Sequence, residues 1–220
     1  MPISKYLTAA DPWHSREPLW CEIDSAAQAA LVLLHGRGGG AKRMLEWAKD
    51  NFLGVSLYAP QAADDTWYPQ RFLQSTTLNQ PYLDSALERV AAVIDYVQYE
   101  TELSNSQIFL LGFSQGACLA AEYCRRHPRR LAGLILMSGG VIGNDYEASE
   151  PVSGTLERTP VYLGCDDNDP FIPFSRVELT AELYIAADAS VALATYRNFG
   201  HRPHLDAVRF TQSLIADMYS

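Results

Sequence analysis

A serine at the end of a buried apolar run is the residue of this chain best suited to nucleophilic chemistry. Residues 112–117 read Gly-Phe-Ser-Gln-Gly-Ala, and they lie between the apolar run Ile108–Leu111 and a helical pattern. In a G-x-S-x-G turn the backbone passes sharply from strand to helix, so the serine hydroxyl is exposed, and glycines stand where side chains would strike neighbouring backbone. We therefore predict that Ser114 is a nucleophile and that the backbone N–H of Gln115 faces an oxyanion formed on it.

Two histidines late in the chain are candidates for the base that a serine hydroxyl needs. His201 and His204 both follow the last apolar run, where the base falls when the chain order is serine, acid, histidine. Gly200-His201 lies in the loop itself, whereas His204 comes after Pro203 and is expected inside the final helix, near the pocket. We therefore predict that His201 is the base.

The acid that orients this base is expected after the apolar run Val161–Leu163, where three aspartates compete. Asp169 is favoured because the proline that follows it stiffens the turn. Asp167 is the alternative, and Asp166 is expected to be a solvated loop charge. The role of Asp169 would be to hold the tautomer of His201 and to stabilise its imidazolium form, without itself taking the proton.

A glycine-rich segment follows the first apolar run and could supply a second oxyanion donor. Residues 35–40 read His-Gly-Arg-Gly-Gly-Gly and precede a helical pattern. Glycines let the backbone approach a substrate closely, and the start of a helix adds partial positive charge. The segment lacks the Gly-Lys-Ser/Thr of a phosphate-binding loop, and its glycines do not fit G-x-G-x-x-G. We predict the backbone N–H of Arg37 as the donor, which is typically worth about 3–4 kcal/mol of transition-state stabilisation.

The elements that must position these residues alternate between strands and helices. Short apolar runs without polar alternation are typical of strands buried on both faces of a parallel sheet. The predicted strands are Leu31–Leu34, Val55–Ala59, Ile108–Leu111, Leu131–Met137, Val161–Leu163 and Val191–Tyr196. The predicted helices are Ala41–Phe52, Leu83–Leu103, Ala117–Arg126, Phe174–Ala187 and Pro203–Tyr219. This order predicts one α/β domain over residues 1–220, with a mostly parallel central sheet, helices on both faces and a site at the carboxyl ends of the strands.

Two connecting segments, Gln61–Pro81 and Val141–Thr159, are too long for ordinary connections, and such loops are often functional. The first is rich in aromatic residues, whereas the second is polar. The candidate pocket residues are Trp67, Tyr68 and Phe72 in the first segment, together with Phe171. The alternative for the loop aromatics is that they pack the loop onto the rest of the protein. Residues Pro12–His14 are a candidate cover.

The composition sets bounds on partners and compartment. The chain has 220 residues, of which 48% are hydrophobic, and a formal net charge of −9, which disfavours nucleic acid and anionic membranes as partners. No apolar run approaches the ~18 residues of a membrane span, and Met1–Tyr6 lacks the apolar core of a signal peptide. The four cysteines form no C-x-x-C pair, so we expect reduced thiols in the cytoplasm, with no zinc site or disulfide framework.

Taken together, these motifs resemble the phospholipase/carboxylesterase family of α/β-hydrolases, which includes acyl-protein thioesterases and small carboxylesterases. The resemblance rests on residues 33–38, 112–117 and 169–173, followed by Gly200-His201. It implies an α/β-hydrolase fold without a large cap domain, and neither a cofactor nor a metal. The residues it implies are a triad of Ser114, Asp169 and His201, with the amides of Arg37 and Gln115 as oxyanion hole.

The chain departs from the usual family pattern at two places. The acid usually comes about three residues after the strand-end glycine, but Gly164 and Asp169 are five apart, so Asp167 stays open. Arg37 stands where the family often has an uncharged residue. A cation there could favour anionic substrates, and the alternative is a solvated surface arginine.

The expected function is that of a serine carboxylesterase, which hydrolyses small carboxylic esters or thioesters through an acyl-enzyme. Its partner would be a small-molecule ester or thioester, with monomer and homodimer both open. The alternative is a lysophospholipase or acyl-protein thioesterase that accepts long chains. A non-catalytic binding protein is a third possibility, but the intact serine, aspartate and histidine count against it. Because the covering segments are short, we expect a preference for acyl chains of about two to six carbons.

Overall fold

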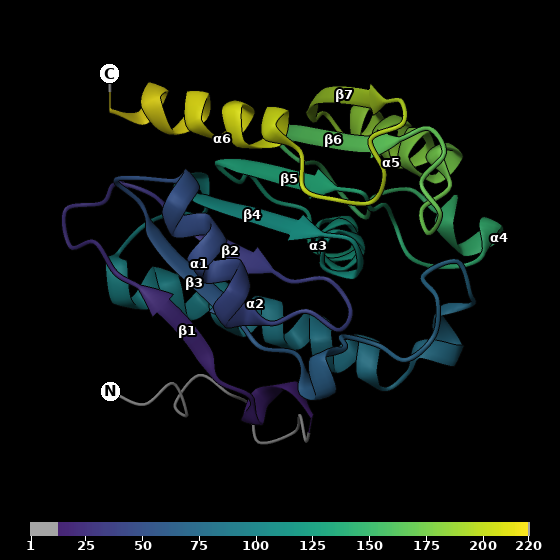
Figure 1. The fold of residues 1–220 in the computed structure, drawn as a ribbon, viewed down its shortest axis with the longest axis horizontal. Helices are drawn as coiled ribbons and strands as arrows, with labels where there is room; N and C mark the ends of the chain where they lie inside the picture. Colours follow the sequence, from purple (N-terminus) through teal and green to yellow (C-terminus); the bar gives the residue numbers. More distant parts are fainter. Residues whose placement is uncertain (1–12, 220) are drawn as a thin grey trace.

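A seven-stranded sheet runs through the computed structural model, which describes residues 13–219 (Figure 1). The strands lie in the order β1-β3-β2-β4-β5-β6-β7. Strand β1 is antiparallel to β3 at one edge, and the other strands run parallel. Their bounds are β1 Leu19–Glu22, β2 Ala30–Leu34, β3 Ser56–Pro60, β4 Ile108–Phe113, β5 Gly133–Met137, β6 Pro160–Asp166 and β7 Ser190–Tyr196.

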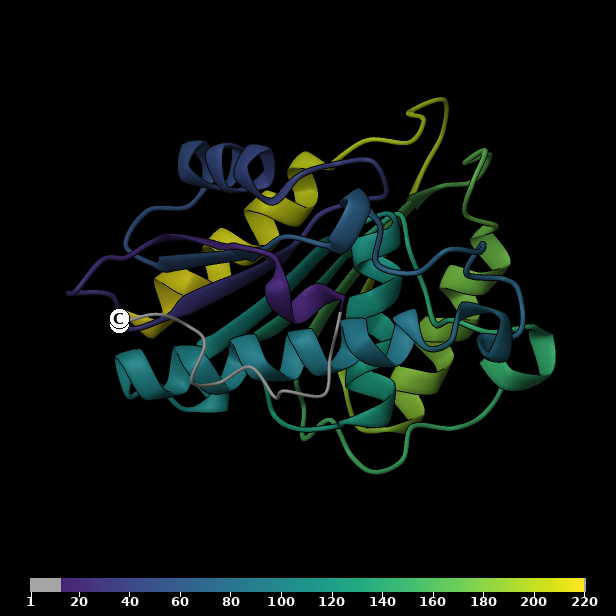
Figure 2. The same ribbon diagram turned by 90° about the horizontal axis from the view of Figure 1, so that it is seen from below.

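Helices cover both faces of this sheet. Figure 2 shows α1 and α6 on one face and α2, α3 and α5 on the other. The helices are α1 Ala41–Asn51, α2 Tyr82–Thr101, α3 Gln115–Arg126, α4 Asp145–Ala148, α5 Phe174–Ala186 and α6 Leu205–Met218. Short 3-10 turns are η2 His14–Arg16, η3 Ala63–Asp65, η4 Thr76–Asn79 and η5 Asn105–Gln107. The described chain therefore has the mostly parallel sheet and the two helical layers that the sequence predicts.

The central strands supply the core because their residues alternate between the two helical layers. Every residue of β2 is buried. Val32 and Leu34 pack in the cluster that includes α2 and α3, whereas Leu31 and Leu33 pack in the cluster that includes α1 and α6. Side chains of a strand point to opposite faces in turn, so one apolar run serves both layers. Truncating one of these leucines to alanine typically costs about 2–5 kcal/mol.

The two edge strands differ from expectation. Strand β1 was not predicted, because it has only four residues, which alternate between half-buried and exposed. Strand β7 forms where predicted, but the expectation of burial on both faces is wrong for it, since Leu193 is 43% exposed. As the last strand of the sheet, β7 has a neighbouring strand on one side only.

The final helix begins later than predicted. Helix α6 starts at Leu205, and His204 is its N-cap residue in an extended conformation, with φ −102° and ψ 133°. The expectation that Pro203 and His204 lie inside the helix is therefore wrong. The two long segments are partly ordered into short helices, with η3 and η4 in the first and α4 in the second.

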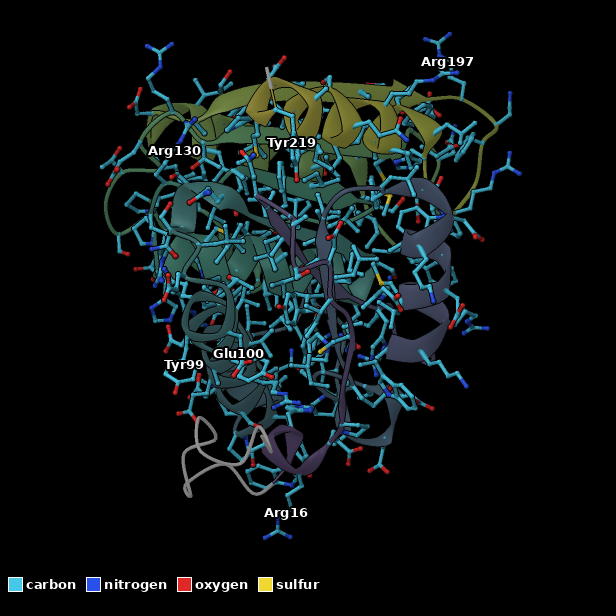
Figure 3. All side chains as sticks on the ribbon, turned by 90° about the vertical axis from the view of Figure 1, so that its left-hand side faces the viewer. Arg16, Tyr99, Glu100, Arg130, Arg197 and Tyr219 are labelled. Atoms are coloured by element: carbon cyan, nitrogen blue, oxygen red, sulfur yellow. The ribbon has the colours of Figure 1, made fainter. Side chains whose placement is uncertain are left out.

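All the parallel strands end at the same edge of the sheet, toward which their arrows point in Figure 1. The segments that follow β2, β4, β6 and β7 therefore meet there. Figure 3 shows the opposite end of the molecule, where Tyr99, Glu100 and Arg130 are found. Among the helices of residues 13–219, none has the length and apolar character needed to cross a membrane.

Candidate active site

Ser114 lies between β4 and α3 in a strained backbone conformation, with φ 54° and ψ −121°. A positive φ is rare for residues other than glycine and is a common mark of functional sites. A Cβ on Gly112 would lie 2.4 Å from the carbonyl oxygen of Gly116, and one on Gly116 would lie 2.1 Å from that of Leu34. The N–H of Ser114 donates to the carbonyl of Met137 at 2.9 Å. The flanking glycines are thus required by close backbone approach, as the sequence predicts.

The side chains of Ser114, His201 and Asp169 form a hydrogen-bonded array. The Nε2 of His201 lies 2.8 Å from the Oγ of Ser114, and its Nδ1 lies 2.7 Å from Oδ2 of Asp169. A carboxylate can only accept, so Nδ1 carries the proton and Nε2 is left to accept from the serine hydroxyl. The array has the order and tautomer needed to remove a proton from the serine.

Local contacts fix the side chains of both Asp169 and His201. The side chain of Asp169 is fully buried, and its Oδ1 accepts from the N–H groups of Phe171 at 2.9 Å and Ile172 at 3.1 Å. The rings of Phe113 and Phe171 each lie 4.9 Å from the His201 ring, centre to centre. The imidazole is therefore held between two aromatic rings as well as by its hydrogen bonds.

Asp166 is not a solvated loop charge, and that expectation is wrong, because the residue is 2% exposed. Its Oδ2 accepts from the N–H of Gly200 at 2.8 Å and from that of Phe199, and its Oδ1 accepts from Asn168 at 2.8 Å. These backbone N–H groups, first those of Asn168 and Gly200, hold the pKa of Asp166 below its usual value. The carboxylate of Asp166 thus joins the loop that carries Asp169 to the loop that carries His201.

Asp167, the alternative acid, points elsewhere. Its Oδ2 lies 3.6 Å from Nε of Arg197, and its Oδ1 accepts from the side chain of Asn168 at 2.9 Å. The Arg197 side chain projects outward at the edge of the molecule in Figure 3 and is 86% exposed. The structure therefore places the carboxylate of Asp169 on the His201 ring, and that of Asp167 at the surface.

His204, the alternative base, is buried behind the site. Its ring stacks on that of Tyr196 at 4.5 Å, and its Nδ1 would lie 2.8 Å from a Cβ on Gly164. Neither ring nitrogen has a hydrogen-bond partner within the described part of the chain. Burial lowers the pKa of His204 to about 4, so its ring is neutral at pH 7.

The glycine-rich segment lies directly against the serine turn, since a Cβ on Gly36 would be 3.3 Å from that of Ser114. His35 holds the segment in place. Its Nδ1 donates to the carbonyl of Gly36 at 2.9 Å, and its Nε2 accepts from the N–H of Ala62 at 3.1 Å. Burial lowers the pKa of His35, consistent with a neutral ring. Arg37, Gln115 and Ser114 consequently line one cavity.

The guanidinium of Arg37 binds backbone. It donates to the carbonyl of Tyr68 at 2.8 Å, of Pro69 at 2.9 Å and of Gln70 at 2.7 Å. Arg37 is exposed, as a surface arginine would be, yet its donors are engaged with protein carbonyls. The side chain thus fastens the loop that follows η3 to the glycine-rich segment.

A cavity of about 310 Å³ opens beside Ser114. Tyr68, Phe72 and Phe171 line it, but Trp67 does not. Trp67 is fully buried, and its Nε1 donates to the carbonyl of His35 at 2.8 Å. For this aromatic residue the alternative interpretation applies, in which it packs the loop onto the rest of the protein. Of the candidate cover, Pro12 lies outside the described residues.

His14, also part of the candidate cover, supports the same loop. It is buried, and its Nε2 donates to the carbonyl of Trp67 at 3.0 Å.

Two further side chains matter to the cavity, and the sequence did not indicate them. The Oε1 of Gln115 accepts from the N–H of Trp67 at 3.1 Å, and its Nε2 donates to the carbonyl of Tyr68 at 2.8 Å. Cys118 lines the cavity too, but burial raises its pKa to about 12, so its thiol stays protonated near pH 7.

Within residues 13–219 no three His, Cys, Asp or Glu side chains are grouped so as to hold a metal ion.

This strand–serine–helix turn, with an acid and a histidine on later loops of the same sheet, defines the class of α/β-hydrolases. The family model described as phospholipase/carboxylesterase matches residues 21–218, and the chain belongs to that family.

Several relatives are similar over most of their length. A phospholipase/carboxylesterase from Dyadobacter fermentans superposes with a TM-score of 0.83 at 31% identity, covering 91% of this chain and 96% of that one. The esterase YpfH of Escherichia coli is 26% identical over 187 residues, which is 81% of this chain and 78% of the relative. Acyl-protein thioesterase 1 of Cryptococcus neoformans is 26% identical over 166 residues, covering 68% and 69%. These relatives place the chain among hydrolases of esters and thioesters.

Proposed function

We propose that this protein is a serine carboxylesterase, which cleaves small carboxylic esters or thioesters through an acyl-enzyme on Ser114. One observation carries the proposal: the hydroxyl of Ser114, on a strained turn, lies 2.8 Å from the Nε2 of His201. A hydroxyl so placed can lose its proton to the imidazole as it attacks a carbonyl carbon.

In the acylation step, the Oγ of Ser114 forms a bond to the carbonyl carbon while its proton passes to His201. The electron pair of the carbonyl moves onto oxygen, and the N–H groups of Arg37 and Gln115 stabilise that charge. When the pair returns, the bond to the leaving oxygen or sulfur breaks, and His201 gives the proton to the departing alcohol or thiol. Asp169 stays ionised throughout and stabilises the imidazolium.

Deacylation repeats these steps with water in place of the serine. His201 takes a proton from the water, whose oxygen attacks the acyl carbon. The bond to Ser114 then breaks, its Oγ recovers the proton, and the carboxylic acid leaves.

The volume of the cavity supports short substrates. At about 310 Å³ it lies at the small end of the range for ligand sites. A methylene that projects beyond the cavity into water gains none of the roughly 0.8 kcal/mol that burial provides. We therefore favour acyl chains of about two to six carbons.

A second candidate function is that of a thioesterase or lysophospholipase for long acyl chains. The observation that favours it is the similarity to acyl-protein thioesterase 1, whose name states that activity. This second function requires a path for the long acyl chain of the substrate beyond the cavity.

A series of p-nitrophenyl esters from acetate to palmitate tests both candidates. We expect kcat/KM to be highest at about two to six acyl carbons, and Ser114→Ala to abolish nearly all turnover. Palmitate turned over as efficiently as butyrate would favour the second candidate. Hydrolysis unchanged in Ser114→Ala would overturn the proposed function.

A further inference from the structure

The cavity beside Ser114 is lined by an arginine whose guanidinium has no partner among residues 13–219. Arg37 and Arg71 line the cavity, whereas no aspartate or glutamate of the described chain does. The guanidinium of Arg37 is engaged with three carbonyls at 2.7–2.9 Å. The guanidinium of Arg71 is exposed and forms no hydrogen bond or ion pair with any residue of the described range, 13–219.

The backbone around Arg71 is nevertheless well anchored. On one side, Arg37 holds the carbonyls of residues 68–70, and the N–H of Gln70 donates to Asn79 at 2.8 Å. On the other side, Phe72 is buried and lines the same cavity. The loop therefore fixes where the Arg71 side chain starts and leaves its guanidinium available to a ligand.

The surroundings of the cavity favour a negative ligand group. The one carboxylate of the array, Asp169, is buried behind His201 and engaged by that ring. Helix α3 begins at Gln115 beside Ser114, and its N-terminus adds partial positive charge. In a chain of net charge −9, this is a local positive region. The planar fork of an arginine matches a carboxylate with two parallel hydrogen bonds.

We propose that the substrate of this protein is a short ester or thioester that also carries a carboxylate, and that Arg71 binds this carboxylate. The inference rests on the proposed function, which it narrows to a substrate class. Arg71 acts in specificity: it does not touch the reacting atoms, and neutral esters remain substrates.

Matched substrate pairs test this proposal. Monoethyl succinate carries the carboxylate on the acyl side. Its neutral partner is ethyl 4-methylpentanoate, in which an isopropyl group replaces that carboxylate. Acetylglycolate carries it on the alcohol side, and isobutyl acetate is its neutral partner. Rates are followed by product release for the wild type and for Arg71→Gln. The control variant is Arg43→Gln, which removes an equal charge from an exposed arginine that lines the adjoining cavity.

We expect the wild type to prefer the anionic member of at least one pair. Arg71→Gln should lower kcat/KM for that member by about 10- to 100-fold, the range for a hydrogen bond to a charged group, with little change for the neutral member. Arg43→Gln should leave the preference intact. The pair whose anionic member loses kcat/KM in Arg71→Gln shows whether Arg71 binds a carboxylate on the acyl side or on the alcohol side of the ester.

Several results would overturn the inference. They are equal rates for both members of each pair, an equal loss for both in Arg71→Gln, or a preference that Arg43→Gln removes as well. In each of these cases the neutral esters are still hydrolysed, so the proposed function stands. Failure of the wild type to hydrolyse any ester would instead count against the proposed function itself.

Discussion

Asp166 is the last residue of β6, and Asp167 and Asp169 follow it, yet the three aspartates have different partners. Asp169 accepts from the ring of His201 and from two N–H groups of its own loop. Asp166 accepts from the backbone of both loops, and Asp167 lies near a surface arginine. Because residue type is the same at all three positions, placement alone gives them different roles, and matched substitutions can separate these roles.

Asp169→Asn should lower kcat by roughly 10⁴-fold, because an amide in this position favours the wrong tautomer of His201. Asp167→Asn, the matched control, should change kcat little, since its carboxylate lies at the surface. Steady-state kinetics on p-nitrophenyl butyrate checks both variants. A large loss in Asp167→Asn with a mild loss in Asp169→Asn would reverse the assignment.

Asp166→Asn should lower kcat by about 10- to 100-fold with little change in KM, because a small displacement of the base costs rate more than binding. The amide would present donors where the N–H groups of Phe199 and Gly200 need an acceptor. The rate of labelling of Ser114 by a fluorophosphonate should fall in parallel. If kcat and the labelling rate both stay at the wild-type values, Asp166 is not a positioning residue.

His204 should make stability depend on pH. Its pKa is about 4 in the folded protein and near 6.5 in the unfolded chain, so the unfolded chain binds more protons between these values. The contribution of His204 to the free energy of unfolding is therefore full above pH 6.5 and is lost as the pH falls toward 4.

The measurement is urea unfolding at pH 7 and pH 5 for the wild type and for His204→Phe. The wild type should lose more stability between the two pH values than the variant does. Equal losses would show that the His204 ring is accessible to protons in the folded state.

At the scale of elements, α3 links the site to the segment that follows β5. The helix begins directly after Ser114 and carries Gln115 and Cys118 on the cavity side. One turn further along, the fully buried carboxylate of Glu122 lies 2.7 Å from Nη2 of Arg125 and 2.6 Å from Nε of Arg126. It also accepts from the N–H of Ile142 at 3.2 Å, which ties the long polar segment to the helix.

Glu122→Ala should lower the free energy of unfolding by about 3–5 kcal/mol, because the Nε and Nη2 groups of buried Arg125 lose their carboxylate acceptor, while Nη1 keeps the carbonyl of Glu147. Glu182→Ala, at an exposed position of α5, is the matched control and should change stability by no more than about 0.5 kcal/mol. Chemical denaturation measures both. A loss below 1 kcal/mol in Glu122→Ala would mean that solvent or another group satisfies Arg125.

For the molecule as a whole, the features that the sequence predicts correctly are those that depend on residues close together in the chain. The buried parallel strands are continuous apolar runs, and the turn at Ser114 is a compact motif whose glycines meet nearby backbone. The burial of Asp166 depends on N–H groups more than thirty residues away. The engagement of Arg37 depends on a loop about thirty residues later in the chain.

The differences between the predicted and the observed elements also arise from contacts between distant residues. The four-residue strand β1 exists because it can pair with β3, and its short sequence carries no strong pattern. The start of α6 depends on where the His204 ring packs, against Tyr196 and under Gly164, rather than on helical propensity alone. Contacts between distant parts of the chain settle such features, so spacing within one segment could not predict them.

The role of Ser114 as nucleophile is tested most directly by identifying the residue that a fluorophosphonate modifies. A phosphonate ester forms only on an activated nucleophile, and peptide mass spectrometry locates it. We expect one added phosphonyl group on the peptide that contains Ser114, none in Ser114→Ala, and much slower labelling in His201→Ala than in His204→Ala. A modification on another residue, or labelling as fast in Ser114→Ala as in the wild type, would contradict the proposed nucleophile.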